Sequence, residues 1–253
     1  MEKLSATIIT FNEERNIGRC IDSVKDIADE ILVVDSFSTD KTKEIALKKG
    51  AKVFDKKWEG YGKAKNLASS LAENEYILSI DADEALSEEL KNSVLQKKKT
   101  AFTGVYSFNR LTNYCGKWIK HSGWYPDKKI RIYPRNSVKW SEDIIHEEIE
   151  FTENPVQTFL KGDLLHYSYY SEDEHWAKAR KYAMMGAQRD LNRKNNFLFF
   201  RSFFGSVSKF IKMYFFQLGF LDGKAGFTIC LISAFAAFIK YSHKRVLLKG
   251  KSL

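Results

Sequence analysis

The sequence of 253 residues contains few cysteines and lacks the common short nucleotide-binding motifs. Its three cysteines, Cys20, Cys115 and Cys230, lie far apart, without the paired spacing of a zinc site or a disulfide framework. A reducing compartment therefore fits the chain best. Neither Gly-x-Gly-x-x-Gly nor Gly-Lys-Ser/Thr occurs, which excludes a Rossmann or P-loop site. His146-Glu147 lacks the second histidine of His-Glu-x-x-His, which argues against a zinc hydrolase.

Two further features are missing, a signal peptide and a long uncharged segment. Met1-Glu2-Lys3 leads directly into a predicted strand, without the basic region and apolar stretch of a signal peptide. The uncharged run from Ala225 to Ile239 has fifteen residues. As a helix it would span about 22 Å, less than the ~30 Å of a bilayer's hydrocarbon core. We therefore expect a protein that is not secreted and a segment that lies in a membrane interface.

The net charge of +9 is distributed unevenly along the chain. From Trp176 onward there are fifteen Lys or Arg against two acids, a net of +13, which leaves −4 for residues 1–175. Twelve of the nineteen Phe lie between Phe197 and Phe238. Cations interleaved with rings are typical of an interfacial amphipathic helix pair, and so much Phe argues against a nucleic-acid partner. The alternative is a helical hairpin that packs against the rest of the protein.

Patterns typical of strands and helices alternate through the first hundred residues. Each apolar run is followed by a segment with apolar residues at helical spacing or by a helix start signal. This alternation predicts an α/β fold with a doubly wound, mostly parallel sheet. The predicted strands are 4–10, 30–35, 51–54 and 76–80, and the predicted helices are 17–24, 42–50 and 63–72.

Polar residues follow three of these predicted strands, at 10–13, 35–40 and 81–84. The carboxyl ends of parallel strands share one edge of a sheet, where ligands bind in open α/β folds. In an extended segment Asp81 and Asp83 point the same way and can converge on a divalent cation that holds a diphosphate. The alternative is that they belong to the acidic first turn of a helix begun at Ser87. Phe11 can stack on a base and Asp35 can accept a hydrogen bond from one, so the set predicts a nucleotide-diphosphate pocket.

Several ordered motifs together resemble glycosyltransferase family 2, whose members have the GT-A fold. Within the family the chain is most similar to lipopolysaccharide core transferases that add β-glucose to an inner-core heptose. The motifs that carry the family resemblance are Thr10-Phe11-Asn12-Glu13-Glu14, Val33-Val34-Asp35-Ser36 with Ser38-Thr39-Asp40, Lys65-Asn66 and Asp81-Ala82-Asp83-Glu84. Segments 130–135, 145–148, 165–168 and 219–223 support the subgroup.

The resemblance implies a GT-A catalytic domain over residues 1–175, with a nucleotide-sugar-binding half (1–100) and an acceptor-side half (101–175). A basic, Phe-rich, membrane-associating tail follows over residues 176–253. The implied activity is inverting transfer of a single sugar, glucose by resemblance, from a UDP-sugar to a lipid-linked oligosaccharide, with Mg²⁺ or Mn²⁺. The resemblance also implies that the protein attaches peripherally to the anionic cytoplasmic face of the bacterial inner membrane. The Gln-x-x-Arg-Trp signature of processive polysaccharide synthases is absent, which favours one sugar per encounter.

The resemblance also implies roles for individual residues on the donor side. Phe11 and Asp35 would contact the uracil, Asp81 the ribose side of the nucleotide, and Asp83 the metal. His166 would approach the metal or the diphosphate, although among tyrosines it could equally be a packed core residue. The other residues predicted to bind the nucleotide-sugar are Thr10, Asn12, Glu13, Ser38, Lys65, Asn66 and Ala82.

Inversion in one step requires a carboxylate that removes the proton of the acceptor hydroxyl. The candidates are Glu147, which we favour, and Asp143, which stays open. Trp124, Arg131 and His146 are predicted on the acceptor or phosphate side, with a core position as the alternative for the tryptophan. The alternative functions are a transferase for another envelope glycan and an inactive membrane protein that binds nucleotide-sugars.

Overall fold

The computed structural model describes residues 2–141, 148–192 and 197–250. The chain forms two compact units, which we describe separately. Unit 1 comprises Met1–Arg110 and Asp127–Tyr167, and unit 2 comprises Leu111–Pro126 and Ser168–Leu253. Packing therefore groups a short central segment with the C-terminal helices, while the functional boundary at residue 175 stays a prediction.

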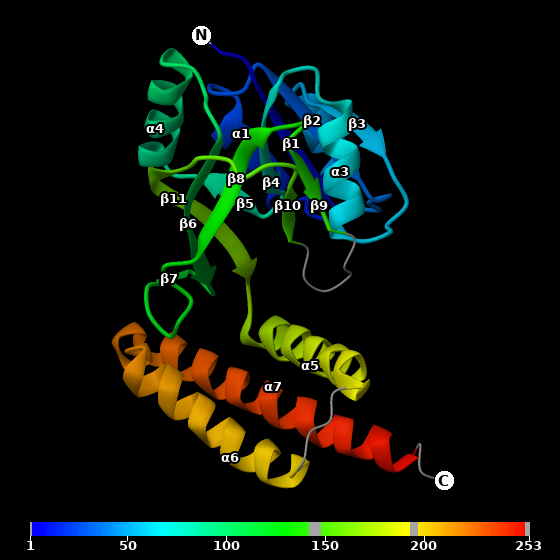
Figure 1. Cartoon of the computed structure of the whole chain (residues 1–253), viewed down its shortest axis with the longest axis vertical. Helices are drawn as coiled ribbons and strands as arrows, with labels where there is room; N and C mark the ends of the chain where they lie inside the picture. Colours follow the sequence, from blue (N-terminus) through cyan, green and yellow to red (C-terminus); the bar gives the residue numbers. More distant parts are fainter. Residues whose placement is uncertain (1, 142–147, 193–196, 251–253) are drawn as a thin grey trace. The chain divides into compact units, whose positions relative to one another are not determined.

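The main sheet confirms the predicted α/β class (Figure 1). Its strand order is β3-β2-β1-β4-β8-β6-β11-β5, with β7 paired to β6. The first four strands in this order are parallel, whereas β8 pairs antiparallel with β4 and β6, and β5 pairs antiparallel with β11. The strands are β1 Leu4–Thr10, β2 Glu30–Asp35, β3 Lys52–Asp55, β4 Tyr76–Asp81, β5 Glu84–Leu86, β6 Val105–Tyr114, β7 Lys117–Ile119, β8 Lys128–Pro134 and β11 Gln157–Tyr169.

Helices cover both faces of the parallel half of this sheet. One face packs against α1, α2 and α4, and the other packs against α3 and the hairpin of β9 and β10. Every residue of β1 is buried, because a parallel strand covered on both sides has no solvent face. These elements are α1 Ile17–Val24, α2 Thr42–Lys48, α3 Tyr61–Leu71, α4 Glu88–Lys99, β9 Val138–Trp140 and β10 Ile149–Phe151.

The acidic segment after β4 turns back into the sheet instead of starting a helix. Glu84 opens β5, and it lies opposite His166 of β11 in the antiparallel register. Helix α4 begins where it was predicted, at Ser87, which caps it by accepting a hydrogen bond from the Leu90 amide at 3.3 Å. The interpretation of Asp81 to Glu84 as an acidic first helical turn is therefore wrong, because pairing with β11 holds this segment in the sheet.

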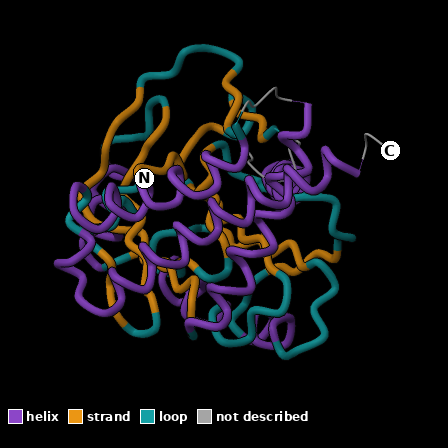
Figure 2. The backbone as a smooth tube through the Cα atoms, turned by 90° about the horizontal axis from the view of Figure 1, so that it is seen from below, coloured by secondary structure: helices purple, strands orange, loops and turns teal. Residues whose placement is uncertain are grey.

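Unit 2 is built mainly from helices. α5 (Glu172–Arg189), α6 (Leu198–Ile211) and α7 (Gly223–Gly250) pack together, joined by short irregular helices at 190–192, 212–216 and 219–222. α6 and α7 lie side by side (Figures 1 and 2). A Cβ on Gly226 would lie 1.9 Å from the carbonyl oxygen of Gly219, so only glycine allows this close approach.

Helix α7 is longer than the uncharged run suggested. Within the described residues, the segment Gly219–Gly250 has the length and composition of a membrane-spanning helix, with a mean hydropathy of 1.5 in its most apolar window. One third of that window is buried inside the protein, at 33%. Length and hydropathy alone therefore do not separate a membrane segment from a core helix.

A buried histidine lies in the aromatic core of unit 2. His175 is 5% exposed, and its ring packs against Tyr114, Trp124 and Tyr169 with centroids 4.6 to 5.6 Å away. Its Nδ1 lies 3.2 Å from the Tyr114 hydroxyl oxygen. Burial, together with the charge of Lys178, lowers the pKa of His175 to about 4.

We predict that His175 makes the stability of the protein depend on pH. In the unfolded chain its pKa is roughly 6.5, so between pH 6.5 and 4 the unfolded chain binds a proton that the folded chain does not. The free energy of unfolding should therefore fall as the pH drops through this window, by at most about 3 kcal/mol from this group. Urea unfolding of the protein and of His175→Asn at pH 7 and pH 5 measures the difference.

The stability gap between the protein and His175→Asn should narrow at the lower pH, since the variant has no imidazole to protonate. His243→Asn is the matched control, because it removes a partly exposed histidine that is not part of the aromatic core around His175. A gap that stays constant from pH 7 to pH 5 would contradict the assignment.

Candidate functional site

The three polar segments predicted to form a pocket meet at one edge of the sheet. In the parallel register Thr10 of β1 lies opposite Asp35 of β2, and Ile9 of β1 lies opposite Asp81 of β4. The polar residues that follow these strands therefore emerge next to one another. The alternation of strands and helices was sufficient to predict this arrangement, because parallel strands end at the same edge.

The loops after β1 and β2 are fastened to each other. The Asn12 amide donates to Ser38 Oγ at 2.8 Å, and the Thr39 amide donates to Asn12 Oδ1 at 2.8 Å. Asp35 is fully buried and accepts two hydrogen bonds from Ser38, at 2.8 Å from the amide and 2.6 Å from the hydroxyl. Asp35 and Ser38 thus brace the loop, and their predicted contact with a nucleotide stays a prediction.

Two exposed aromatic rings stand on these loops. Phe11 is 54% exposed and Phe37 is 58% exposed. Phe37 and Asn12 both adopt positive φ, 61° and 53°, a backbone state that is uncommon outside glycine. Phe37 was not among the predicted site residues, although an aromatic ring within a polar turn was a signal for it.

A cluster of opposite charges lies under the end of β4. The Arg131 guanidinium lies 2.6 Å from Glu84 Oε1 and 3.2 Å from Asp81 Oδ2. The Lys65 ammonium lies 3.2 Å from Asp81 Oδ1, and the Asp81 amide donates to Glu84 Oε2 at 3.0 Å. Arg131, which we placed on the phosphate side, therefore pairs with carboxylates of its own unit.

This cluster fixes the charge of Asp81. Burial by itself would raise the pKa of this carboxyl, but the charges of Lys65 and Arg131 outweigh it and hold the pKa well below its usual range. Burial would likewise lower the pKa of Arg131, but the carboxylates of Glu84 and Asp81 raise it. Asp81 is therefore ionised at neutral pH and unsuited to act as a general acid or base.

Two buried oxygens at this edge lack a hydrogen-bond partner among the described residues. One is Thr10 Oγ1, and the other is Asp81 Oδ1, which lies 3.2 Å from the Lys65 ammonium. Buried polar atoms are normally satisfied, so orphaned ones at a strand edge are consistent with a site for a polar ligand. Both residues were predicted to bind the nucleotide-sugar.

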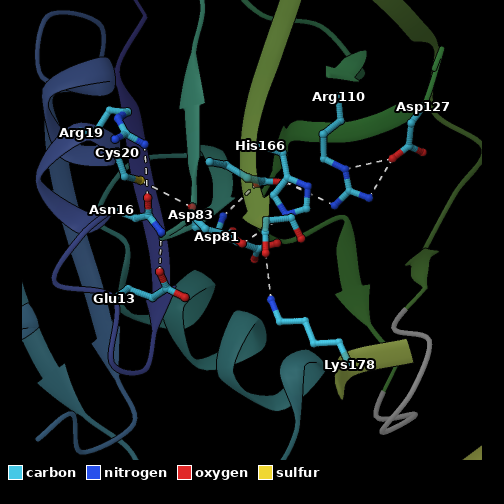
Figure 3. A network of polar contacts seen from close by, with 12 residues as sticks. Glu13, Asn16, Arg19, Cys20, Asp81, Asp83, Arg110, Asp127, His166 and Lys178 are labelled. Atoms are coloured by element: carbon cyan, nitrogen blue, oxygen red, sulfur yellow. Dashed lines mark hydrogen bonds and ion pairs between the residues drawn. The ribbon is translucent and has the colours of Figure 1, made fainter. Parts of the chain in front are cut away.

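Asp83 and His166 meet beside this cluster (Figure 3). His166 Nε2 lies 3.2 Å from Asp83 Oδ2, and the Asp83 carbonyl accepts a hydrogen bond from the Tyr167 amide at 2.8 Å. The two side chains predicted to bind a metal are thus brought together from β11 and from the turn before β5. No group of three or more His, Cys, Asp or Glu that could hold a metal occurs within the ranges that the structure describes.

A chain of polar contacts flanks the pair on the α1 side (Figure 3). Asn16 Nδ2 donates to Glu13 Oε2 at 2.7 Å, and Arg19 donates to Asn16 Oδ1 at 3.2 Å. The Arg19 guanidinium carbon also lies 3.7 Å from the centre of the Tyr167 ring. Glu13 was predicted at the site, whereas Arg19 was not, because its position on a helix face gave no motif signal.

Arg110 is a further cation that sequence reasoning missed. Its Nε donates to Asp127 Oδ2 at 2.9 Å, and its Nη1 lies 3.6 Å from Glu84 Oε1 (Figure 3). Arg110 and Asp127 are seventeen positions apart and come from β6 and the segment before β8. Only the pairing of those strands brings them to the end of β4.

The Lys65-Asn66 motif connects α3 to β9. Asn66 donates from Nδ2 to the Trp140 carbonyl at 2.9 Å and accepts from the Trp140 amide at 2.8 Å. Lys65 Nζ lies 4.4 Å from the centre of the Trp140 ring. Asn66 therefore holds a strand in place, and its predicted role in binding the donor stays a prediction.

The structure describes two further predicted residues, Ala82 and Trp124. Ala82 is buried in the turn, where its amide donates to the Ile9 carbonyl at 3.2 Å. Trp124 belongs to unit 2 and packs in the aromatic core around Tyr114. Asp143, His146 and Glu147 lie outside the described residues.

We predict that Arg131 is essential to the stability of unit 1. Arg131→Met leaves Glu84 and Asp81 without their shared cation, and losing one partner of a buried ion pair costs roughly 3 to 5 kcal/mol. Urea unfolding measures this loss. Adding Glu84→Gln should recover part of it, because one of the uncompensated carboxylates is then removed.

The control for this prediction is Lys43→Met, which breaks the exposed pair between Lys43 and Asp55. Exposed ion pairs contribute about 1 kcal/mol or less, so this variant should stay close to the unchanged protein. Equal losses for the two variants would show that the Arg131 cluster does not support the fold.

Comparison with known proteins identifies relatives along the whole chain. Residues 5–162 match the model of glycosyl transferase family 2. An uncharacterised glycosyltransferase of Rickettsia typhi is 34% identical over 265 residues, covering 100% of this chain and 90% of the relative. The lipopolysaccharide core biosynthesis glycosyltransferase LpsC of Rhizobium meliloti is 27% identical over 247 residues, covering 93% of this chain and 89% of LpsC.

Two solved structures are also similar, with low TM-scores. TarS residues 1–349 of S. aureus in complex with UDP is 18% identical, with a TM-score of 0.47 over 98% of this chain and 92% of that chain. Glucosyl-3-phosphoglycerate synthase of Mycobacterium tuberculosis, solved with Mn²⁺, UDP and glucosyl-3-phosphoglycerate, is 23% identical, with a TM-score of 0.37 over 44% of each chain. Both TM-scores are below 0.5.

Proposed function

The chain belongs to glycosyltransferase family 2, and on that premise we propose that it transfers one sugar, with inversion, from a UDP-sugar to a lipid-linked acceptor. The observation that carries the proposal is the meeting of Asp83 and His166, 3.2 Å apart, beside the polar edge of the sheet. This edge combines exposed aromatic rings, orphaned buried oxygens and several cations. Those groups suit the base, hydroxyls and phosphates of a nucleotide-sugar.

The residues present fit a divalent metal held jointly with the diphosphate. A carboxylate oxygen and an imidazole nitrogen form a donor set that suits Mn²⁺, and Mg²⁺ would rely more on water and phosphate oxygens. Asp83 and His166 would hold the ion, with phosphates and water as the other ligands. A bound ion would neutralise the negative charge that develops on the departing diphosphate.

The acceptor hydroxyl must lose its proton as its oxygen attacks the anomeric carbon and the bond to the diphosphate breaks. Asp81 is too weak a base for this role, because Lys65 and Arg131 hold the pKa of its carboxyl well below the usual range. Glu147 is our first candidate for the base and Asp143 is the alternative. Asn66 holds Trp140, the last residue of β9, which lies just before the segment that carries both candidates.

The similarity to LpsC, a lipopolysaccharide core biosynthesis glycosyltransferase, supports a lipopolysaccharide core as the acceptor. The inner core as the acceptor and UDP-glucose as the donor are our proposal, and they rest on the family resemblance of the sequence. The alternatives are a different envelope glycan and an inactive protein that binds nucleotide-sugars. A lipid-linked acceptor also fits the basic, Phe-rich unit 2, which we propose to attach peripherally to the anionic cytoplasmic face of the inner membrane. The net charge of +13 after Trp176 supports that attachment.

The experiment that tests this function measures UDP release from a panel of UDP-sugars, with Mn²⁺ or with chelator, and with or without extracted lipopolysaccharide core. We expect one donor to be consumed, only with metal and faster with acceptor. Asp83→Asn should weaken Mn²⁺-dependent UDP binding by more than about tenfold, because it removes a charged ligand. Asp26→Asn is the matched control. Asp26 is exposed on unit 1 and precedes β2, whereas the polar edge lies at the far end of that strand.

Three results would change the proposal in different ways. UDP binding without release from any donor would favour the inactive binder. Release that is unaffected by chelator and by Asp83→Asn would remove the metal. Absence of UDP binding by the unchanged protein would overturn the function altogether.

A separate prediction concerns the base. Of Glu147→Gln and Asp143→Asn, the variant that removes the base should bind UDP-sugar normally and lose at least about a hundredfold in turnover. Single-turnover measurements with saturating acceptor separate turnover from binding. If both variants keep full turnover, neither carboxylate is the base.

A further inference from the structure

Helices α6 and α7 leave an apolar groove between them. Phe203, Val207 and Phe210 line it from α6, and Leu231, Phe235 and Phe238 line it from α7. Its volume of about 460 Å³ lies within the roughly 300 to 1,000 Å³ of sites for small ligands. Ser206 also lines the groove. Its hydroxyl donates a hydrogen bond to the Ser202 carbonyl, so a ligand in the groove does not need to accept one from it.

The groove belongs to a much larger apolar surface of unit 2. Of the 27 large apolar side chains that are exposed within the described residues, 18 lie between Phe197 and Leu248. Monomeric soluble proteins rarely expose contiguous apolar patches larger than a few hundred Å². A surface this rich in exposed rings needs a partner that is itself apolar.

Cations stand at both ends of the apolar stripe on α7. Phe227, Leu231, Phe235 and Phe238 follow at helical spacing and are exposed. Lys224 precedes the stripe by one turn, and Arg245 continues it seven positions after Phe238. Lys224 is 89% exposed, and its ammonium lies 3.9 Å from Glu172 Oε1, which is itself exposed. The Arg245 guanidinium carbon lies 5.3 Å from the centre of the Phe199 ring on α6.

The two acids that follow Trp176 are turned inward. Asp190 lies 2.7 Å from Lys240 and its carbonyl accepts from Lys244, while Asp222 lies 3.1 Å from His121 Nδ1. Helices α6 and α7 contain no Asp or Glu, so their exposed charges are positive, and Glu172 at the start of α5 is the acid that lies near Lys224. A second copy of the chain would bring the same positive charges together, whereas an anionic lipid surface would complement them.

We propose that the α6–α7 groove is a binding site for one acyl chain of an anionic phospholipid of the bilayer, with Lys224 and Arg245 facing headgroup phosphates. The rest of α7 packs against α5 and α6, so only one side of the helix offers an apolar surface. Such one-sided helices lie along a membrane interface. The site rests on the proposed function only in that a lipid-linked acceptor requires the enzyme to be at the membrane.

The test uses the whole protein and spin-labelled phosphatidylglycerol in vesicles of phosphatidylglycerol and phosphatidylcholine. Electron paramagnetic resonance should show an immobilised lipid component that is larger with labelled phosphatidylglycerol than with labelled phosphatidylcholine. Leu231→Asp places a carboxylate in the groove and should weaken this association at least about tenfold. Phe216→Asp is the matched control, because Phe216 is 81% exposed but does not line the groove, and it should retain the component.

Four results would overturn the site. Equal losses in the two variants would mean diffuse partition instead of a groove. The same component with both labelled lipids would remove the roles of Lys224 and Arg245. A component seen only with a labelled lipid-linked saccharide would assign the groove to the acceptor. A dimer in solution that Leu231→Asp dissociates would assign it to a second copy.

This test is independent of the transferase activity. Leu231→Asp should bind UDP with Mn²⁺ as the unchanged protein does, since the substitution lies in unit 2. Absence of the lipid component in the unchanged protein, with intact UDP release, would overturn only the groove. Absence of UDP binding with an intact lipid component would overturn only the proposed function.

Discussion

The ion cluster of Arg131, Asp81 and Glu84 is the interaction on which the polar edge of the sheet depends. It joins the end of β4 to the antiparallel half of the sheet, because Arg131 lies on β8 and Glu84 opens β5. Charges buried this deeply are tolerated only when they are paired. The cluster fixes the turn that contains Asp83, and His166 of β11 is held against that turn.

Several separate side-chain hydrogen bonds hold the loops at this edge in place. Ser38 and Asn12 fasten the loops of β1 and β2 to each other, while Asn66 fastens α3 to β9. Each uses the side chain of a short polar residue to satisfy a backbone group or to brace a carboxylate. Phe11 and Phe37 lie on the same loops but are exposed, so their rings are accessible to a ligand.

Unit 2 obeys a different constraint from unit 1. Its core around Tyr114 and Met213 is small, and most of its phenylalanines remain exposed. Helical periodicity in this region indicated amphipathic helices, but it could not separate a packed hairpin from a membrane surface. The structure shows that α7 packs on one side and leaves a cation-flanked apolar stripe on the other, which a packed hairpin alone would not require.

The sequence by itself determined the strand and helix alternation and the meeting of three polar segments at one edge. These depend on local periodicity and on motifs, which are written in neighbouring residues. The family resemblance placed Asp83 at the metal and His166 near the metal or the diphosphate, and the contact between the two side chains came only from the structure. Only the tertiary structure decided that Arg131 binds carboxylates and that Arg110 reaches the same cluster. Such contacts depend on which strands pair and in which register, and that choice is made by packing over the whole chain.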